Sequence, residues 1–430
     1  MAEIQPFQAF RYSQSDLSDL IAPPYDVLTK KDKADLISKH EQNIVSIDLP
    51  HLPPKTAGPD EAYERAAGEL VSWIDTHRLV RDPEPALYVY HQTYNLAGQT
   101  LTRKMFFARL RLEPLGKGRV FAHEQTFGGP KEDRLKLTQA TRCNLSPIFA
   151  LYPDAENEVA GILDGAIEDE PDHSAMMDGV LNKVWVVTDS LTVTEVQEKL
   201  GELPIYIADG HHRYSTALNF RQFRDDEQEG ESDPDDPQNF VLTALAGMED
   251  PGATIRPYFR TVADLPRLTT ADLTAALHDA FKATQVPRPT NEGDLARQLS
   301  TAGPHALALN VAKDGICTIL VPRDVDMLAK LEPDRHPSWR KLPYTVLHRY
   351  IIDEIIRRQF NDGNAPKIHY HKTMDDAIDD ARKNHGFAAL MPATTMSELR
   401  DVCTAGELMP QKSTYFHPKL ATGLVINPLY

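Results

Sequence analysis

Apolar residues recur along this chain with two periods, one typical of helices and the other of strands. At residues 60–77 they follow a helical spacing, which predicts a helix, and a shorter helix is expected at 30–40. Two β-like runs at 86–94 and 101–111 flank a short loop that contains Gly98. This arrangement predicts a β-hairpin.

Short apolar runs in the middle of the chain predict further strands. They lie at 147–152, 183–188, 204–208 and 240–246. A helix is expected at 216–223, and a strand-rich tail is expected at 412–427. Because strands interleave with helices, we expect an α/β or α+β fold with mixed sheets, and no periodicity separates these two classes.

The length of the chain, 430 residues, corresponds to two or three structural units at roughly 150 residues each. We expect an N-terminal α/β part at 1–152, a core part at 153–250 and a C-terminal mixed α/β part at 251–430. The core part contains an acidic stretch at 225–238 that has almost no apolar residues, and this stretch is expected to be a solvated loop. The three parts are expected to form one intertwined unit.

The charge of the chain restricts its partners. Lys and Arg total 46 against 63 Asp and Glu, which gives a formal net charge of −17. Because a negative surface repels phosphodiester backbones and no basic stripe offsets it, we expect no nucleic-acid partner. A small anionic ligand in a locally positive pocket remains compatible with this charge.

The cysteines and the hydropathy indicate a cytoplasmic protein. Cys143, Cys317 and Cys403 are widely spaced and form no CxxC pair, as expected of free thiols in a reducing compartment. No apolar run approaches the ~18 residues that a membrane span needs, and no signal-peptide pattern is present. We expect a soluble protein with no membrane partner.

The segment at 209–213, DGHHR, carries the strongest chemical signal. It follows an apolar strand and begins a helix, whose N-terminal N–H groups and partial positive charge favour anions. Gly210 allows close approach of a ligand, while His212 and Arg213 add donors suited to phosphate. Asp209 is a candidate N-cap, Mg²⁺ ligand or base. The alternative is an ordinary capped turn with two surface histidines.

A second cluster spans HEQT at 123–126 and KEDR at 131–134, in a stretch that is expected to be loop-like. Glu124 is a candidate general base, and Arg134 is a candidate phosphate ligand. The alternative is a solvated charged loop. HEQT lacks the second histidine of HExxH, which excludes a zincin motif.

The C-terminal tail supplies further candidates, with an ordinary surface segment as the alternative. The side chains that could reach phosphate or substrate there are Lys412, Ser413, Thr414, His417 and Lys419. His369 and His371 lie on one face of an expected strand, but no third ligand is near, so no metal site is predicted. The common nucleotide-binding motifs, such as the P-loop, are absent from the sequence.

Several motifs, taken in order, resemble one family. They are APPYDV at 22–27, HEQT at 123–126, KEDRLKL at 131–137, NLSPIF at 144–149, ADGHHRYSTAL at 208–218 and AGELMPQKSTYFHPKLATGLVI at 405–426. Together they resemble the family catalogued as domain of unknown function 1015. The ADGHHR string is also similar to the phosphate-binding motif of the ParB/sulfiredoxin superfamily.

That second resemblance implies a ParB/sulfiredoxin-like nucleotide-binding core with elaborations at both ends. Sulfiredoxin has a cysteine where this chain has His211, so sulfinic-acid reduction is not expected. Free-serine kinases of the superfamily carry a DGHHR-like string. The resemblance therefore implies ATP- and Mg²⁺-dependent phosphorylation of a small hydroxylated metabolite, with free serine as a candidate.

The roles that follow from the residues and the resemblance are catalytic for Asp209, Glu124 and His211. The expected nucleotide ligands are Gly210, His212, Arg213, Arg134 and Lys412. The alternative function is a regulatory protein that binds ATP or CTP with little or no turnover.

Overall fold

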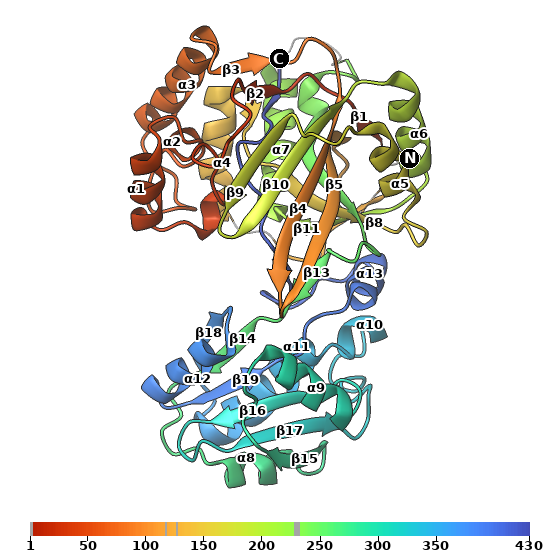
Figure 1. Ribbon diagram of the computed structural model, residues 1–430. Coiled ribbons are helices and arrows are strands. Elements are labelled where there is room, and N and C mark those ends of the chain that lie inside the picture. The colour runs from red at the N-terminus through yellow and green to blue at the C-terminus, as the bar shows by residue number, and fades with distance from the viewer. Residues whose placement is uncertain (1–2, 117, 126–127, 228–232) are drawn as a thin grey trace. The chain divides into compact units, whose positions relative to one another are not determined.

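The computed structural model describes the chain apart from residues 1–2, 117, 126–127 and 228–232, and it contains two compact units (Figure 1). Unit 1 comprises residues 1–254 and 418–430, and unit 2 comprises residues 255–417. Thr126 of the HEQT motif lies outside the described residues, as does the centre of the acidic stretch.

The three expected parts are distributed over these units as follows. Residues 1–152 and 153–250 both lie in unit 1, whereas residues 251–430 are divided between the two units. The chain returns to unit 1 only for its last thirteen residues, 418–430.

Unit 1 is built on a nine-stranded mixed sheet with the order β6-β11-β8-β12-β5-β4-β10-β9, to which β1 is added beside β5. Most neighbours are antiparallel, but β11 pairs with β6 and β12 pairs with β8 in parallel. The strands are β1 (Ile4–Gln5), β4 (Leu87–Leu96), β5 (Gln99–Arg111), β6 (Val120–Phe121), β8 (Ile148–Tyr152), β9 (His173–Met177), β10 (Val180–Val187), β11 (Ile205–Asp209) and β12 (Phe240–Gly247). The predicted hairpin is β4–β5, and the prediction of mixed sheets is confirmed.

Helices cover this sheet because its strands are apolar on both faces. All eight residues of β12 are buried. One face packs against apolar residues of α5 (Glu158–Ala166), α6 (Ser190–Gly201) and α7 (His211–Glu227). This cluster includes Leu163 of α5 and Val196 of α6, both buried.

The remaining helices of unit 1 lie mainly in its first 141 residues. They are η1 (Tyr25–Val27), α1 (Lys30–Lys39), α2 (Val45–Asp48), α3 (Asp60–Asp75), α4 (Gly128–Thr141) and η2 (Pro237–Asn239). The predicted helices at 30–40 and 60–77 correspond to α1 and α3. Helix α4 packs against both α3 and α7. Short pairs β2 (Phe10–Tyr12) with β3 (Leu79–Arg81) and β7 (Cys143–Asn144) with β21 (Asn427–Pro428) complete the unit.

Unit 2 contains a six-stranded sheet with the order β15-β17-β16-β19-β14-β18. Its strands are β14 (Phe259–Val262), β15 (Phe281–Val286), β16 (Leu307–Val311), β17 (Cys317–Pro322), β18 (Ile368–His371) and β19 (Phe387–Leu390). One face packs against α8 (Thr270–Leu277) and the π-helix η3 (Leu347–Phe360), and the other packs against α9 (Glu292–Ala302) and α12 (Met374–Lys383). The other elements are α10 (Pro337–Arg340), α11 (Pro343–Val346), α13 (Met396–Thr404) and the pair β13 (Thr254–Arg256) with β20 (Tyr415–His417).

Two sequence-based expectations about local structure are wrong. The tail at 412–427 is largely irregular, with strand structure only in β20 and at the start of β21. The stretch at 131–134 belongs to helix α4 rather than to a loop. Among the described helices, none is both long and apolar enough to cross a membrane.

Candidate anion-binding site in unit 1

The candidate site is centred on the junction between β11 and α7. Four apolar residues of β11 are buried, and the strand ends at Asp209, whose Oδ1 accepts the N–H of Gly210 at 2.9 Å. Gly210 has a φ of +91°, a left-handed conformation that glycine adopts without strain. A Cβ there would lie 3.0 Å from Cγ2 of Ile148 and 3.1 Å from the guanidinium of Arg213. Glycine therefore leaves the room that the Arg213 guanidinium occupies beside the turn.

Asp209 lies between two cations. Lys419 Nζ donates to Asp209 Oδ2 at 2.9 Å, and Arg213 Nη2 lies 3.9 Å from the same oxygen. Burial opposes the carboxylate charge, but Lys419 and then Arg213 outweigh burial and lower the pKa of Asp209 below its usual value. Asp209 is therefore ionised at neutral pH, and its immediate surroundings carry one negative and two positive groups.

His211 occupies the first position of α7 and is buried. Its ring meets the ring of His123 edge-on, with 4.6 Å between centroids. The backbone N–H of His123 donates to Nε2 of His211 at 3.3 Å, so this nitrogen carries no proton. Burial, and then the neighbouring His123, lowers the pKa of His211 well below its usual value. His211 is thus a neutral imidazole that joins α7 to the HEQT segment.

His123 continues the connection towards β11. Its Nδ1 donates to the backbone carbonyl of Ile207 at 2.9 Å. Burial lowers the pKa of His123 as well, although the charge of Glu124 partly opposes that shift. The two predicted motifs, HEQT and DGHHR, are therefore in contact through a pair of neutral imidazoles.

His212 and Glu124 are more accessible than this pair, because both side chains are partly exposed. Burial lowers the pKa of His212, and the attraction of Glu124 opposes the shift. Glu124 forms no ion pair with any residue that the structure describes. Both side chains are therefore partly open to solvent, unlike the rings of His123 and His211.

Arg134 has a different environment. Its Nε donates to Asp133 Oδ2 at 2.9 Å, and its Nη1 donates to the backbone carbonyl of Asp48 at 2.6 Å and lies 3.3 Å from Asp48 Oδ1. The guanidinium carbon lies 3.9 Å from the ring centroid of Tyr25. Asp133 also accepts the hydroxyl of Tyr63 at 2.7 Å. Arg134 is therefore held by two carboxylates, a backbone carbonyl and an aromatic ring of the protein itself.

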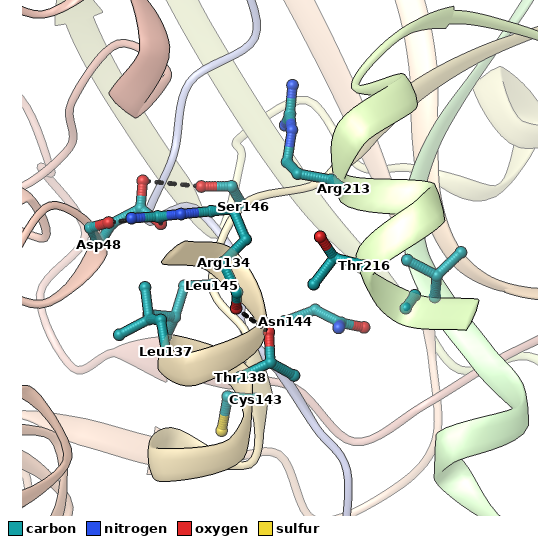
Figure 2. A pocket seen from close by; sticks show the side chains of 12 residues that line it. Asp48, Arg134, Leu137, Thr138, Cys143, Asn144, Leu145, Ser146, Arg213 and Thr216 are labelled. Carbon is teal, nitrogen blue, oxygen red and sulfur yellow. Dashed lines mark hydrogen bonds and ion pairs between the residues drawn. The ribbon is translucent and has the colours of Figure 1, made fainter. Parts of the chain in front are cut away.

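A small cavity lies between Arg134 and α7 (Figure 2). Its volume is about 40 Å³, room for water-sized molecules but not for a whole nucleotide. Figure 2 shows Arg134, Asp48 and Ser146 together on one side, whereas Arg213 and Thr216 project from α7. Ser146 donates to Asp48 Oδ2 at 2.8 Å, so the Asp48 carboxylate is shared between Ser146 and Arg134, whereas the buried Nη2 of Arg134 has no hydrogen-bond partner among the described residues.

Contacts between segments that are distant in sequence bring several of the motifs together. Tyr25, from the first motif, stacks on Arg134, from the third. Ser146, from NLSPIF, lies 3.2 Å from the hydroxyl of Thr422 in the tail. The backbones of Ala22 and Thr422 exchange two hydrogen bonds, at 3.1 and 2.8 Å. Motifs from both ends of the chain thus meet beside α4 and α7.

The sequence predicted most of the residues at this junction but not the side chains that they contact. Asp48 and Ser146 were not among the candidates, although Ser146 lies inside a recognised motif. Lys419 was one of several tail residues and was not singled out, yet it is the tail residue that binds Asp209.

Lys412 belongs to unit 2, whereas the other expected nucleotide ligands belong to unit 1. The backbone carbonyl of Lys412 accepts from Arg260 Nη2 at 2.7 Å, and Lys412 Nζ lies 5.6 Å from the ring centroid of Tyr258. His369 and His371 both contact Asp380 Oδ2, at 2.7 and 3.1 Å. Among the described residues no group of three His, Cys, Asp or Glu side chains could hold a metal ion.

The protein has a mixed α/β fold, and the β11–α7 junction is a positively charged turn between a buried strand and a helix. The chain belongs to the family described as protein of unknown function (DUF1015), whose model matches residues 4–344. This confirms the resemblance to domain of unknown function 1015, and five of the six motifs lie within the matched residues. No curated protein matches the sequence.

Solved structures with similar folds are distant. A free serine kinase in complex with AMP has a TM-score of 0.32 and 11% identity, and the match covers 71% of this chain and 92% of that chain. A conserved hypothetical protein from Pyrococcus furiosus has a TM-score of 0.31 and 12% identity, with 70% and 89% covered. SbnI with a C-terminal truncation, from Staphylococcus aureus, has a TM-score of 0.34 and 10% identity, with 72% and 84% covered. Similarities at this level carry no inference about activity.

Proposed function

We propose that the protein uses the β11–α7 junction to bind the phosphates of ATP and to phosphorylate a small hydroxylated metabolite, with free serine as a candidate. The observation that carries this proposal is the arrangement of one carboxylate, Asp209, with two cations, Arg213 and Lys419, at the start of a helix. A surplus of positive charge beside helix N–H groups is suited to phosphate.

The residues at the junction have separable roles in this proposal. Arg213 and His212 bind phosphate oxygens, the Asp209 carboxylate holds Lys419, and the backbone carbonyl of Pro147 accepts from Arg213 Nη1 and positions it. His211 and His123 are positioning residues, since they are buried and neutral and connect α7 to the segment that carries Glu124. Glu124 is the better of the two candidate bases because Asp209 is already paired with cations and has a lowered pKa.

The donor set fits a nucleotide better than a metal held by the protein alone. Phosphate oxygens match the two cations, while the carboxylates Asp209 and Glu124 belong to no group of three metal-binding side chains among the described residues. Mg²⁺ commonly binds through substrate phosphates and only one or two carboxylates, which this site can supply. When bound, Mg²⁺ neutralises charge on the phosphates.

The reaction then follows from phosphoryl transfer. The substrate hydroxyl oxygen forms a bond to the γ-phosphorus of ATP, the bond from that phosphorus to the bridging oxygen breaks, and ADP leaves. Glu124 accepts the hydroxyl proton. Because the chemistry depends mainly on positioning and on cations near the moving charge, the junction needs no covalent nucleophile.

The decisive experiment measures nucleotide binding and turnover separately on the full chain. Thermal unfolding with ATP, ADP, AMP and CTP, each with Mg²⁺, should reveal stabilisation of about 2.7 kcal/mol at a ligand concentration of 100 times Kd. ADP formation is then followed with serine, other amino acids and polyols as acceptors. We expect ADP to form only when the right acceptor is present.

Two variants separate the roles. Glu124→Gln should keep nucleotide stabilisation and lower turnover by about 10²- to 10⁴-fold, the usual range for a general base. Glu158→Gln, which changes an exposed carboxylate on α5, is the matched control and should leave both readouts unchanged. Stabilisation by nucleotide without turnover on any acceptor would favour the regulatory alternative, and the absence of both would refute nucleotide use.

A further inference from the structure

Unit 2 contains a second cavity, with a volume of about 510 Å³. Its lining comes from α9 and from β15 and β17, the outer strands of the six-stranded sheet. Its volume is within the range of roughly 300–1,000 Å³ that is usual for small-molecule sites. The cavity in unit 1, at about 40 Å³, is far below that range.

The side chains of β15 alternate between the two faces of the sheet, and this places polar residues in the lining of the cavity. Phe281 and Ala283 point to the face that packs on α8 and η3 and contribute to the core there. Lys282 and Thr284 point to the opposite face, and both are exposed. Helix α9 packs over the neighbouring strands through Leu295 and leaves this outer part of the sheet accessible.

The floor of the cavity is apolar and its rim is polar. Ile319 and Val321 of β17 provide the floor. Lys282 lies on one side of the rim and forms no ion pair with any described residue. Arg297 of α9 lies in the same lining, and it has one partner, Asp294, at 3.0 Å.

Gln298 adds an unsatisfied polar atom to the lining. Its Nε2 donates to Asp294 Oδ2 at 3.2 Å, whereas its Oε1 is buried and has no hydrogen-bond partner. Buried polar atoms are usually satisfied by protein, water or ligand. Gln298 Oε1 requires an N–H or O–H donor, such as water, whereas Lys282, Arg297 and the hydroxyl of Thr284 are the groups of the lining that suit an anion.

We propose that this cavity binds a small organic acid with an apolar body, such as an aliphatic or aromatic carboxylic acid. The carboxylate pairs with Lys282 and lies beside Arg297, whose charge Asp294 already compensates in part. The apolar body covers Ile319 and Val321, and removal of that surface from water supplies the remaining affinity. Such a site gives unit 2 a ligand of its own, independent of the nucleotide proposed for unit 1.

Isothermal titration calorimetry of the full chain with octanoate and with 1-naphthoate tests the proposal, with the neutral alcohols octanol and 1-naphthalenemethanol as comparison. We expect saturable binding of the carboxylates. Lys282→Glu should weaken it by about fivefold, which corresponds to ~1 kcal/mol for an exposed ion pair. Ala302→Trp, which places an indole on an exposed lining position, should abolish it.

Lys330→Glu provides the matched control, because Lys330 is an exposed lysine of unit 2 outside the lining. It should bind as the wild type does. Carboxylates that bind equally well to Ala302→Trp, or alcohols that bind as tightly as the acids, would overturn the proposal. So would absence of binding combined with a dimer that Ala302→Trp dissociates, since the cavity would then be an interface between copies of this chain. None of these outcomes depends on nucleotide binding.

Discussion

Two clusters of charge in unit 1, each with one arginine in the lining of the small cavity, have opposite compositions. Around Arg134, one cation contacts two carboxylates, Asp48 and Asp133. Around Asp209, one carboxylate contacts two cations, Arg213 and Lys419. The first cluster has no positive charge left for a ligand, whereas the second has a cation in excess.

The two clusters also differ in solvent exposure, and the one around Asp209 is the more exposed. The side chains of Arg134, Asp48 and Asp133 are at most 6% exposed, whereas that of Asp209 is 26% exposed and that of Lys419 is 20% exposed. A buried group whose charges are compensated holds the fold together, while a partly exposed group with excess charge can accept an anion. Arg134 was expected to bind nucleotide. Its contacts instead favour a structural role, and the following experiments test this difference.

The largest effect should come from Arg134→Met, which leaves two buried carboxylates without their cation. We expect the free energy of unfolding to fall by about 3–5 kcal/mol, measured by denaturant unfolding. Arg382→Met removes an exposed cation paired with Asp379 and should cost no more than about 1 kcal/mol. Adding Asp48→Asn to Arg134→Met should restore part of the loss, because one uncompensated charge disappears. An Arg134→Met protein as stable as the wild type would contradict the structural role.

Arg213→Ala should have its main effect on ligand binding. We expect the Kd for nucleotide to rise about ten- to hundredfold, the equivalent of ~1.5–3 kcal/mol for hydrogen bonds to a charged group. The free protein should lose less stability than Arg134→Met does, because Lys419 still pairs with Asp209. Arg224→Ala, near the other end of α7, removes a cation paired with Glu227 and is the matched control. Equal Kd values for both variants would remove Arg213 from the site.

Local patterns predicted the elements of this fold better than its long-range contacts. The helix at 60–77 and the hairpin could be predicted because their apolar positions repeat within a few residues. Helix α4 could not, since Asp133 and Arg134 are typical of a solvated loop when read locally. They are buried only because Asp48, remote in sequence, compensates the arginine.

The candidate site shows the same limit. The turn at Gly210 and the helix after it follow from the residues themselves, and the structure confirms both. The pairing of Asp209 with Lys419 joins residues 210 positions apart, so no local pattern could reveal it. The contact between Ser146 and Thr422 is equally remote. The order of the motifs indicated that they belong together, but not which side chains meet.

Gly210→Ala changes the backbone beside Asp209 and leaves the cluster around Arg134 unchanged. An alanine at a φ of +91° should cost about 1–2 kcal/mol of stability. Gly98→Ala is the matched control, because Gly98 has a φ of +83° but no atom within 4 Å of a new Cβ. Only Gly210→Ala should also weaken nucleotide binding, since its Cβ would meet the Arg213 guanidinium. Similar nucleotide affinity in both variants would show that this contact is not needed.

The smallest effect we expect is a difference in pH dependence between the two clusters. Burial raises the pKa of Asp48, despite the opposing charge of Arg134, whereas the cations around Asp209 overcome burial and lower its pKa. A carboxyl whose pKa is lower in the folded than in the unfolded state, where it is about 3.9, stabilises the fold at higher pH, and this stabilisation is lost as the pH falls. A carboxyl whose pKa is raised by folding destabilises the fold at higher pH, and this destabilisation is relieved as the pH falls. From about pH 6 to about pH 3, the wild type should therefore lose stability relative to Asp209→Asn and gain it relative to Asp48→Asn. Denaturant unfolding of the three proteins across this range measures both slopes. Parallel slopes for the two variants would mean that the clusters do not differ in the way their contacts indicate.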